Sequence, residues 1–208
     1  MRTIDWYFDF VSPYSYLALY RLRELPQDAS VRYRPVLFAG LLAHFGQKGP
    51  AEIAAKRKWT YRWCTWWARK LGVPFRFPAA HPFNPLQHLR LAIAADCAPA
   101  AVLQVFDDVW TSGEDAGDPR RVERLCRLLG VDPARLAEPD VKDALRRNTD
   151  EAAARGVFGV PSFVVDDEVF WGADAMDFLK ACLADPGLLQ SDEMRRVSSL
   201  PVGASRKA

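Results

Sequence analysis

The sequence has only four cysteines, and no two of them form a C-x-x-C motif. All four fall in segments whose residue spacing is typical of helices, so buried, reduced thiols are the favoured interpretation. The segment Met1 to Asp5 lacks a basic stretch followed by an apolar one, so we expect no cleaved signal peptide and a cytoplasmic location. The four cysteines are Cys64, Cys97, Cys126 and Cys182.

An excess of one charge is missing as well. The 28 Lys and Arg residues face 26 Asp and Glu residues, which gives a formal net charge of +2. No large positive field therefore favours nucleic acid or an anionic membrane as a partner. No uncharged apolar stretch approaches the roughly 18 residues of a membrane span. The three histidines, His44, His81 and His88, show no metal-ligand spacing, so no metal site is expected. A small-molecule or protein partner remains.

The 208 residues have the composition of one globular domain, with room for an insertion, since 50% are hydrophobic and 12% aromatic. Residues 3 to 10 alternate like a strand, with aromatics on both sides that predict burial of both faces. Ser12 and Pro13 then read as the N-cap and first residue of a helix. Residues 31 to 37 return to β-type side chains, which completes a β-α-β unit with a parallel pair of strands.

Proline at the start and glycine at the end mark a series of helices through the middle of the chain. Two short strands follow, Ser162 to Val165 and Glu168 to Trp171, joined by a turn at Asp166-Asp167. The chain then predicts a helix from Asp174 to Leu183 and a loosely packed or disordered tail beyond Asp185. The helices of the middle part are predicted at residues 50–71, 85–98, 99–110, 119–129 and 139–155.

This order predicts an α/β fold, in which βαβ and ββα halves form one sheet domain and a large all-helical insertion interrupts them. The expected sheet domain is discontinuous, residues 1–40 and 156–185. The insertion covers residues 41–155, is expected to need a core of its own, and is followed by a tail at 186–208. Four tryptophans of the first long helix, Trp59, Trp63, Trp66 and Trp67, recur at helical intervals and are expected in a core or an interface.

Two short segments carry the chemistry. The first is Phe8-Asp9-Phe10-Val11-Ser12-Pro13-Tyr14-Ser15-Tyr16, where a hydroxyl stands at the N-terminus of a helix. Free N–H groups and positive potential at that end stabilise an anion, such as a thiolate. The second is Gly159-Val160-Pro161, where Pro161 is expected at the start of a strand and a cis peptide bond is possible. Each segment alone favours a purely structural role.

Together the two segments resemble those of thioredoxin-like disulfide oxidoreductases with a helical insertion. Ser12-Pro13-Tyr14-Ser15 stands where those enzymes have C-x-x-C, so dithiol exchange is excluded. With serine at that place, the chain is similar to the family of 2-hydroxychromene-2-carboxylate isomerases and kappa-class glutathione transferases over residues 3 to 184. Further shared motifs are Gly46-Gln47-Lys48-Gly49-Pro50 followed by Lys56, Phe77-Pro78 with Phe83-Asn84, and Gly172-Ala173-Asp174.

The resemblance implies a thioredoxin-like fold, glutathione as cofactor, a small aromatic carboxylate as substrate and a homodimer. It places the glutathione thiol against the Ser12 hydroxyl, which stabilises the thiolate and is not itself the nucleophile. Val160, ahead of Pro161, is implied to pair with the cysteinyl part of glutathione. The resemblance also implies contacts with glutathione at Gln47, Lys56, Gly172, Ala173 and Asp174, and contacts with substrate at Lys56 and Asn84.

The sequence departs from the family pattern at Gln47, where asparagine is common, and at Ala175, where a polar residue is common. Asn84 precedes Pro85, so an N-cap role is favoured over a substrate contact, and Asp174 is equally interpreted as the N-cap of the last helix. The favoured function is glutathione-dependent isomerisation of 2-hydroxychromene-2-carboxylate, or a related aromatic compound, to trans-o-hydroxybenzylidenepyruvate. The alternatives are a kappa-like transferase that releases a glutathione adduct and a redox-inactive module that binds an extended peptide beside Pro161.

Overall fold

A computed structural model describes residues 2–204 of the chain and shows a four-stranded sheet in the order β2-β1-β3-β4. The strands are β1 (Arg2–Phe8), β2 (Ala29–Pro35), β3 (Ser162–Val165) and β4 (Glu168–Trp171). β1 pairs with β2 in parallel and with β3 antiparallel, and β3 and β4 form the predicted hairpin. Asp166 and Asp167 in its turn both have positive φ, 49° and 67°, as tight two-residue hairpins require.

β1 is central and buried on both faces, as its aromatic pattern predicted. Trp6 and Phe8 are fully buried, and Trp6 lies opposite Phe163 of β3. Asp5 is a buried charged residue in this strand. Arg32 donates to both its carboxylate oxygens, at 2.7 and 2.8 Å, and Arg155 donates to it at 2.7 Å. Burial acts to raise the pKa of Asp5, but these hydrogen bonds outweigh it and lower the pKa.

The helix after β1 begins where the sequence predicted. α1 (Pro13–Arg21) has Ser12 as its N-cap and Pro13 as its first residue, and it buries Tyr16, Leu17 and Ala18. A further helix, α2 (Phe38–His44), follows β2 and was not predicted. Its N-cap is Leu37, which has no side-chain acceptor, so the local sequence gives no start signal.

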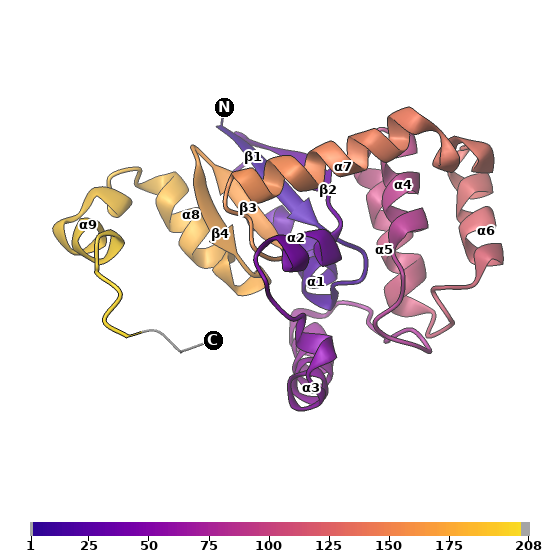
Figure 1. The fold of residues 1–208 in the computed structure, drawn as a ribbon, viewed down its shortest axis with the longest axis horizontal. Coiled ribbons are helices and arrows are strands. Elements are labelled where there is room, and N and C mark those ends of the chain that lie inside the picture. Colours follow the sequence, from indigo (N-terminus) through magenta and orange to yellow (C-terminus); the bar gives the residue numbers. More distant parts are fainter. Residues whose placement is uncertain (1, 205–208) are drawn as a thin grey trace.

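The middle of the chain is helical, as predicted, with α3 (Ala54–Leu71), α4 (Leu86–Ala94), α5 (Pro99–Thr111), α6 (Pro119–Leu129) and α7 (Pro139–Ala154) (Figure 1). Residues Pro50–Glu52 form a 3₁₀ turn ahead of α3 rather than its first turn. α4 ends four residues before the predicted Ala98, because Asp96 and Cys97 adopt positive φ and the Cys97 N–H closes on the Ala92 carbonyl at 2.8 Å.

The expectation of a separate helical core was wrong. One hydrophobic cluster runs from the sheet into the helices, since Phe106 of α5 packs against Trp6 and Phe10, with ring centroids 6.1 and 4.5 Å apart. A second cluster covers the other face of the sheet and joins Tyr7 to α2 and α7. Helices and sheet therefore stabilise one another directly.

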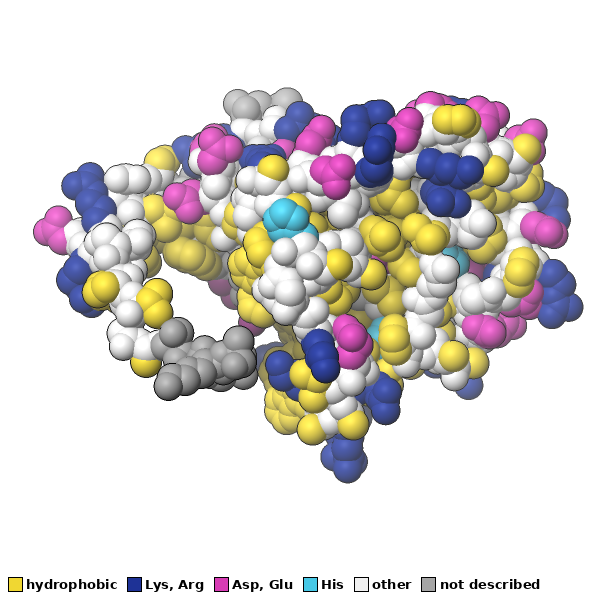
Figure 2. Space-filling model, viewed as in Figure 1, with side chains coloured by type: hydrophobic (Ala, Val, Ile, Leu, Met, Phe, Trp, Pro, Cys, Tyr) yellow, Lys and Arg dark blue, Asp and Glu magenta, His cyan; other side chains and the backbone are white. Residues whose placement is uncertain are grey.

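α3 stands apart from the other helices at the lower edge of the molecule in Figure 1. Hydrophobic side chains lie on the same part of the surface in Figure 2. Trp67 is buried, but Trp59 and Trp66 are 65% and 51% exposed, so the four tryptophans do not share a core. No helix among residues 2–204 is both long and apolar enough to cross a membrane.

The C-terminal part begins with a 3₁₀ turn, Ala173–Ala175, which leads into α8 (Met176–Ala184). The predicted loose tail instead contains a short helix, α9 (Asp192–Ser198), none of whose residues is buried. It lies at the far end of the molecule from α6 (Figure 1). The expectation for residues 205–208 lies outside the described residues.

Candidate active site

Ser12 lies at the junction of β1, α1 and the segment before β3. Its Oγ accepts the Ser15 N–H at 3.2 Å, so the predicted helix-capping role is confirmed. The same hydroxyl donates to the Val160 carbonyl at 3.5 Å, a long hydrogen bond between residues 148 positions apart. Ser12 is 6% exposed. The structure thus brings the two segments singled out by the sequence into contact.

The Val160–Pro161 peptide bond is cis, as the sequence allowed. Pro161 comes directly before β3, and its carbonyl accepts the Gly172 N–H at 2.9 Å. Gly172 has φ of 103°, which side chains rarely permit, and a Cβ there would lie 2.4 Å from the Asp174 carboxylate. The Gly172-Ala173-Asp174 turn is therefore fixed beside the cis-proline.

Within that turn the three residues differ in what they expose. Ala173 is buried and its carbonyl accepts from Arg21 at 2.9 Å, whereas the Asp174 side chain is exposed. Asp174 is not the N-cap of α8, because Ala175 occupies that position. Burial raises the pKa of Tyr14, in the first turn of α1, to about 12.

Gln47, Lys56 and Asn84 occupy more peripheral places. Gln47 follows α2, and Lys56 lies in the first turn of α3; both side chains are exposed. Asn84 is exposed too, and its side chain accepts the Leu86 N–H at 3.1 Å at the start of α4. It is nevertheless not the N-cap, because Pro85 occupies that position. Within residues 2–204, no side-chain hydrogen bond joins these three residues to Ser12.

Sequence reasoning missed two residues beside the site. Asp9 is fully buried, and its carboxylate accepts the N–H groups of Val11 at 3.0 Å and Phe38 at 2.9 Å. Burial raises the pKa of Asp9 to about 7, although these hydrogen bonds oppose the rise. Trp171 is 56% exposed and lies over Gly159, where a Cβ would come within 2.7 Å of its indole nitrogen. The sequence signal available for Asp9 was an acidic residue between two aromatic residues at the end of a buried strand.

The thiols do not join this site as nucleophiles. Cys64, Cys126 and Cys182 are buried as predicted, and Cys97 is half-buried, in a turn rather than a helix. Burial raises the pKa of Cys64 to about 12. A buried thiol with a raised pKa is a poor nucleophile.

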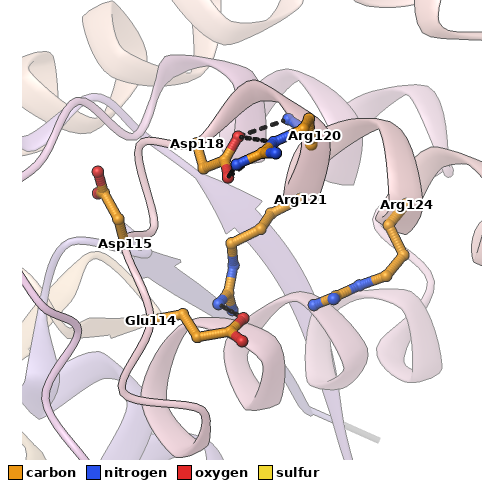
Figure 3. Close-up of a pocket in the computed structure, with 6 residues that line it drawn as sticks. All are labelled: Glu114, Asp115, Asp118, Arg120, Arg121 and Arg124. Atoms are coloured by element: carbon orange, nitrogen blue, oxygen red, sulfur yellow. Dashed lines mark hydrogen bonds and ion pairs between the residues drawn. The ribbon is translucent and has the colours of Figure 1, made fainter.

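A surface cavity of about 380 Å³ lies elsewhere, between α5 and α6 (Figure 3). Arg121 is buried there and donates to Asp108 at 2.7 Å, to Ser112 at 2.9 Å and to Glu114. Arg124 also donates to Asp108, at 2.5 Å. Because these charged groups neutralise one another, we interpret them as an ion-pair network that stabilises the fold. The residues that line the cavity are Glu114, Asp115, Asp118, Arg120, Arg121 and Arg124. No group of three potential metal ligands occurs among residues 2–204.

Comparison with known proteins identifies the family of the chain. A model of the DSBA-like thioredoxin domain matches residues 3–184. The chain is 35% identical to a 2-hydroxychromene-2-carboxylate isomerase of Sphingobium xenophagum, over 88% of this chain and 99% of that protein. It is 27% identical to a glutathione S-transferase kappa 2 of Caenorhabditis elegans, over 89% and 93% of the two chains. A solved 2-hydroxychromene-2-carboxylate isomerase superposes with a TM-score of 0.76 at 29% identity, covering 92% of this chain and 98% of that one. The chain therefore belongs to the DSBA-like thioredoxin domain family, and within it to the family of the 2-hydroxychromene-2-carboxylate isomerases and kappa-class glutathione transferases.

Proposed function

We propose that the protein is a glutathione-dependent isomerase that converts 2-hydroxychromene-2-carboxylate, or a related small aromatic carboxylate, to trans-o-hydroxybenzylidenepyruvate. The observation that carries the proposal is the Ser12 hydroxyl, which lies at the start of α1 and faces the Val160 carbonyl beside the cis-proline. The 35% identity with the isomerase of Sphingobium xenophagum supports the reaction type. Assembly as a homodimer and a cytoplasmic location belong to the same proposal.

The residues around Ser12 fit a bound glutathione thiolate. The hydroxyl of Ser12 donates only a long 3.5 Å hydrogen bond to Val160, so it is free to turn toward a better acceptor. A thiolate is such an acceptor, because hydrogen bonds to charged groups are shorter and stronger than neutral ones. The first N–H groups of α1 add positive potential at the same point. Ser12 and α1 thus lower the pKa of the thiol and keep the sulfur ionised near neutral pH.

The remaining contacts with glutathione follow from the turn beside Pro161. We place the backbone of Val160 against the cysteinyl part of the tripeptide, in the manner of an added strand. The exposed Asp174 carboxylate accepts from the γ-glutamyl ammonium, and Gly172 lets the backbone come close. Ala173 contributes through its backbone, since its side chain is buried. Gln47 is exposed and contacts the other end of the tripeptide.

When bound, glutathione supplies a thiolate that adds reversibly to the unsaturated carbon of the substrate and so permits rotation about the former double bond. Lys56, exposed on the first turn of α3, holds the substrate carboxylate by a charge-assisted hydrogen bond. Asn84 is a second substrate contact, and binding there competes with its hydrogen bond to the Leu86 N–H. Ser12 stays a hydrogen-bond donor to sulfur throughout.

A kappa-like transferase is the second candidate, because the Caenorhabditis elegans relative carries that name. It would use the same Ser12 site and release glutathione joined to its substrate. The two candidates differ in what becomes of the thiol, since an isomerase returns one thiol per turnover and a transferase consumes one.

The test is to convert a hydroxychromene carboxylate with glutathione present well below the substrate concentration. We expect complete conversion to the trans product, with the free-thiol concentration constant throughout. Consumption of thiol in step with product would establish the transferase instead. As a prior check, glutathione at about 100 times its dissociation constant should raise the free energy of unfolding by about 2.7 kcal/mol. No stabilisation at any concentration would remove both enzyme candidates.

A further inference from the structure

Three residues separate β1 from Ser12, and two of them, Phe10 and Val11, are held by side chains from distant parts of the chain. Trp110 of α5 donates its indole N–H to the Phe10 carbonyl at 3.0 Å. His81, in the loop between α3 and α4, has its Nε2 2.8 Å from the Val11 carbonyl. The Asp9 carboxylate accepts the Val11 N–H. The position of this segment is therefore set by tertiary contacts rather than by the sheet.

The peptide group that joins Val11 to Ser12 is fixed at both ends. His81 holds its carbonyl, and its N–H donates to the Asp9 carbonyl at 3.1 Å. The Ser12 hydroxyl itself makes one ordinary and one long hydrogen bond, at 3.2 and 3.5 Å. The direction in which the Ser12 hydroxyl points therefore depends on the backbone, and a tilt of this peptide group changes that direction.

The hydrogen positions on His81 follow from its partners. A carbonyl can only accept, so Nε2 must carry the hydrogen that bonds to Val11. In the neutral ring Nδ1 is then an acceptor. The Tyr61 hydroxyl lies 2.7 Å from Nδ1 and also 2.7 Å from the His81 carbonyl, so its one hydrogen is shared between these two acceptors. Burial lowers the pKa of His81, which keeps the ring neutral around pH 7. Tyr61 belongs to α3, so the chain of contacts runs from α3 through His81 to the peptide group before Ser12.

Aromatic rings surround His81 and restrict its orientation. The rings of Phe77, Trp110 and Tyr61 lie with centroids 5.6, 5.6 and 5.2 Å from that of His81. Because two hydrogen bonds and three rings determine its place, the imidazole is a rigid support.

We propose that His81 is a positioning residue for Ser12: its Nε2–H, oriented by the Tyr61 hydroxyl, holds the Val11 carbonyl and thereby aims the Ser12 hydroxyl at the thiol sulfur. This inference rests on the proposed function for the role of the sulfur. The mechanical part, from His81 to Ser12, does not depend on glutathione and is tested separately.

The ligand-free test uses amide hydrogen exchange of the full chain. His81→Phe keeps a ring of similar size but removes both nitrogens. We expect exchange of the Ser12 and Ser15 amides to accelerate at least tenfold, while the Phe163 amide in β3 keeps its rate. His81→Gln can place an amide N–H near the former Nε2, and should restore most of the protection. The control is His44→Gln, an exposed histidine of α2. Unchanged exchange in a folded His81→Phe would overturn the proposal.

The second test asks whether the support acts on the chemistry. In His81→Phe we expect kcat to fall about tenfold and the pKa of the bound thiol to rise by about one, the equivalent shift. His81→Gln should recover kcat to within about threefold, and Tyr61→Phe should lie between the two. Equal losses in the Phe and Gln variants would show that an N–H donor at this place does not restore the function of His81, and would overturn the assignment. If His81→Phe does not fold, Tyr61→Phe and His81→Gln carry both tests. If wild type does not bind glutathione, but His81→Phe shows the expected changes in amide exchange, only the proposed function is refuted.

Discussion

Two buried polar regions of the molecule use their hydrogen bonds in opposite ways. Around Arg121, charged and polar groups satisfy one another: the guanidinium bonds to Asp108 and Ser112 and to Glu114 (Figure 3). Around Ser12, polar groups are left underused: the Ser12 hydroxyl donates across 3.5 Å, and the buried Ser15 hydroxyl has no partner. The first arrangement serves stability, and the second leaves the Ser12 hydroxyl able to bond to the thiolate of the proposed function. Variants in the two regions should therefore separate stability from activity.

The largest expected effect on stability comes from the Arg121 region. Arg121→Met should lower the free energy of unfolding by about 3 to 5 kcal/mol, because it leaves Asp108 buried with only the partly exposed Arg124 as partner. Urea unfolding gives the value, and kcat/KM of the folded fraction should stay near wild type. Arg120→Ala is the control, because its solvent-exposed ion pair with Asp118 should contribute little to stability. Equal losses from the two variants would contradict the contrast between buried and exposed pairs.

The pH dependence of stability should show one buried titrating group from each region. His88 lies by the Arg121 network with both ring nitrogens unpaired, and burial lowers its pKa from 6.5 to about 4. The unfolded state then binds more protons, so stability is lost as the pH falls from about 6.5 to about 4. Asp9 has its pKa raised from 3.8 to about 7 by burial, so it acts in the opposite sense: stability is lost as the pH rises through that window.

Unfolding free energies of wild type and single variants, measured at several pH values, separate the two groups. The wild-type advantage over His88→Phe should shrink by about 3 kcal/mol between about pH 7 and pH 4. The wild-type advantage over Asp9→Asn should shrink in the other direction, as the pH rises from about 4 to about 7. Parallel curves for wild type and either variant would show that the group does not titrate in this range.

The smallest expected effect is at Lys56, whose side chain is exposed. Lys56→Met should raise KM for the aromatic carboxylate by about threefold to tenfold, since a solvent-exposed ion pair is worth about 1 kcal/mol. Affinity for glutathione and the free energy of unfolding should hardly change. The matched control is Lys58→Met, because Lys58 is also exposed and lies two positions from Lys56. Loss of glutathione affinity instead would place Lys56 on the cofactor side of the site.

The same contrast explains what could be predicted from the sequence. The bounds of elements that proline, glycine or turn residues mark in the local sequence were predicted closely. α6 begins at Pro119 and ends before Gly130, and the strands of the hairpin have the predicted bounds. α2 was missed because its first free N–H, that of Phe38, is bonded by Asp9, 29 positions earlier in the chain. A cap supplied from a distance leaves no local signal.

The site was predictable only in part for the same reason. Ser12 and Pro161 were singled out by short motifs, and the structure places their segments together. The residues that position the segment before Ser12 could not be predicted from short motifs. His81 stood in a His-Pro loop without a recognisable partner, and Trp110 read as one more apolar residue of α5; their contacts with Val11 and Phe10 exist only after folding.

The most direct test of the account is the pKa of glutathione thiol bound to wild type and to Ser12→Ala, followed by thiolate absorbance at roughly 240 nm. In wild type we expect a pKa below the free-thiol value of about 8.5, and in Ser12→Ala a rise of about 1 to 2 units with a tenfold to hundredfold loss of kcat, because one hydrogen bond to a charged group is removed. Ser15→Ala, which removes a hydroxyl that has no partner, should leave the thiol pKa nearly unchanged. A Ser12→Ala protein with the wild-type thiol pKa and full activity would contradict the account and reduce Ser12 to the cap of α1.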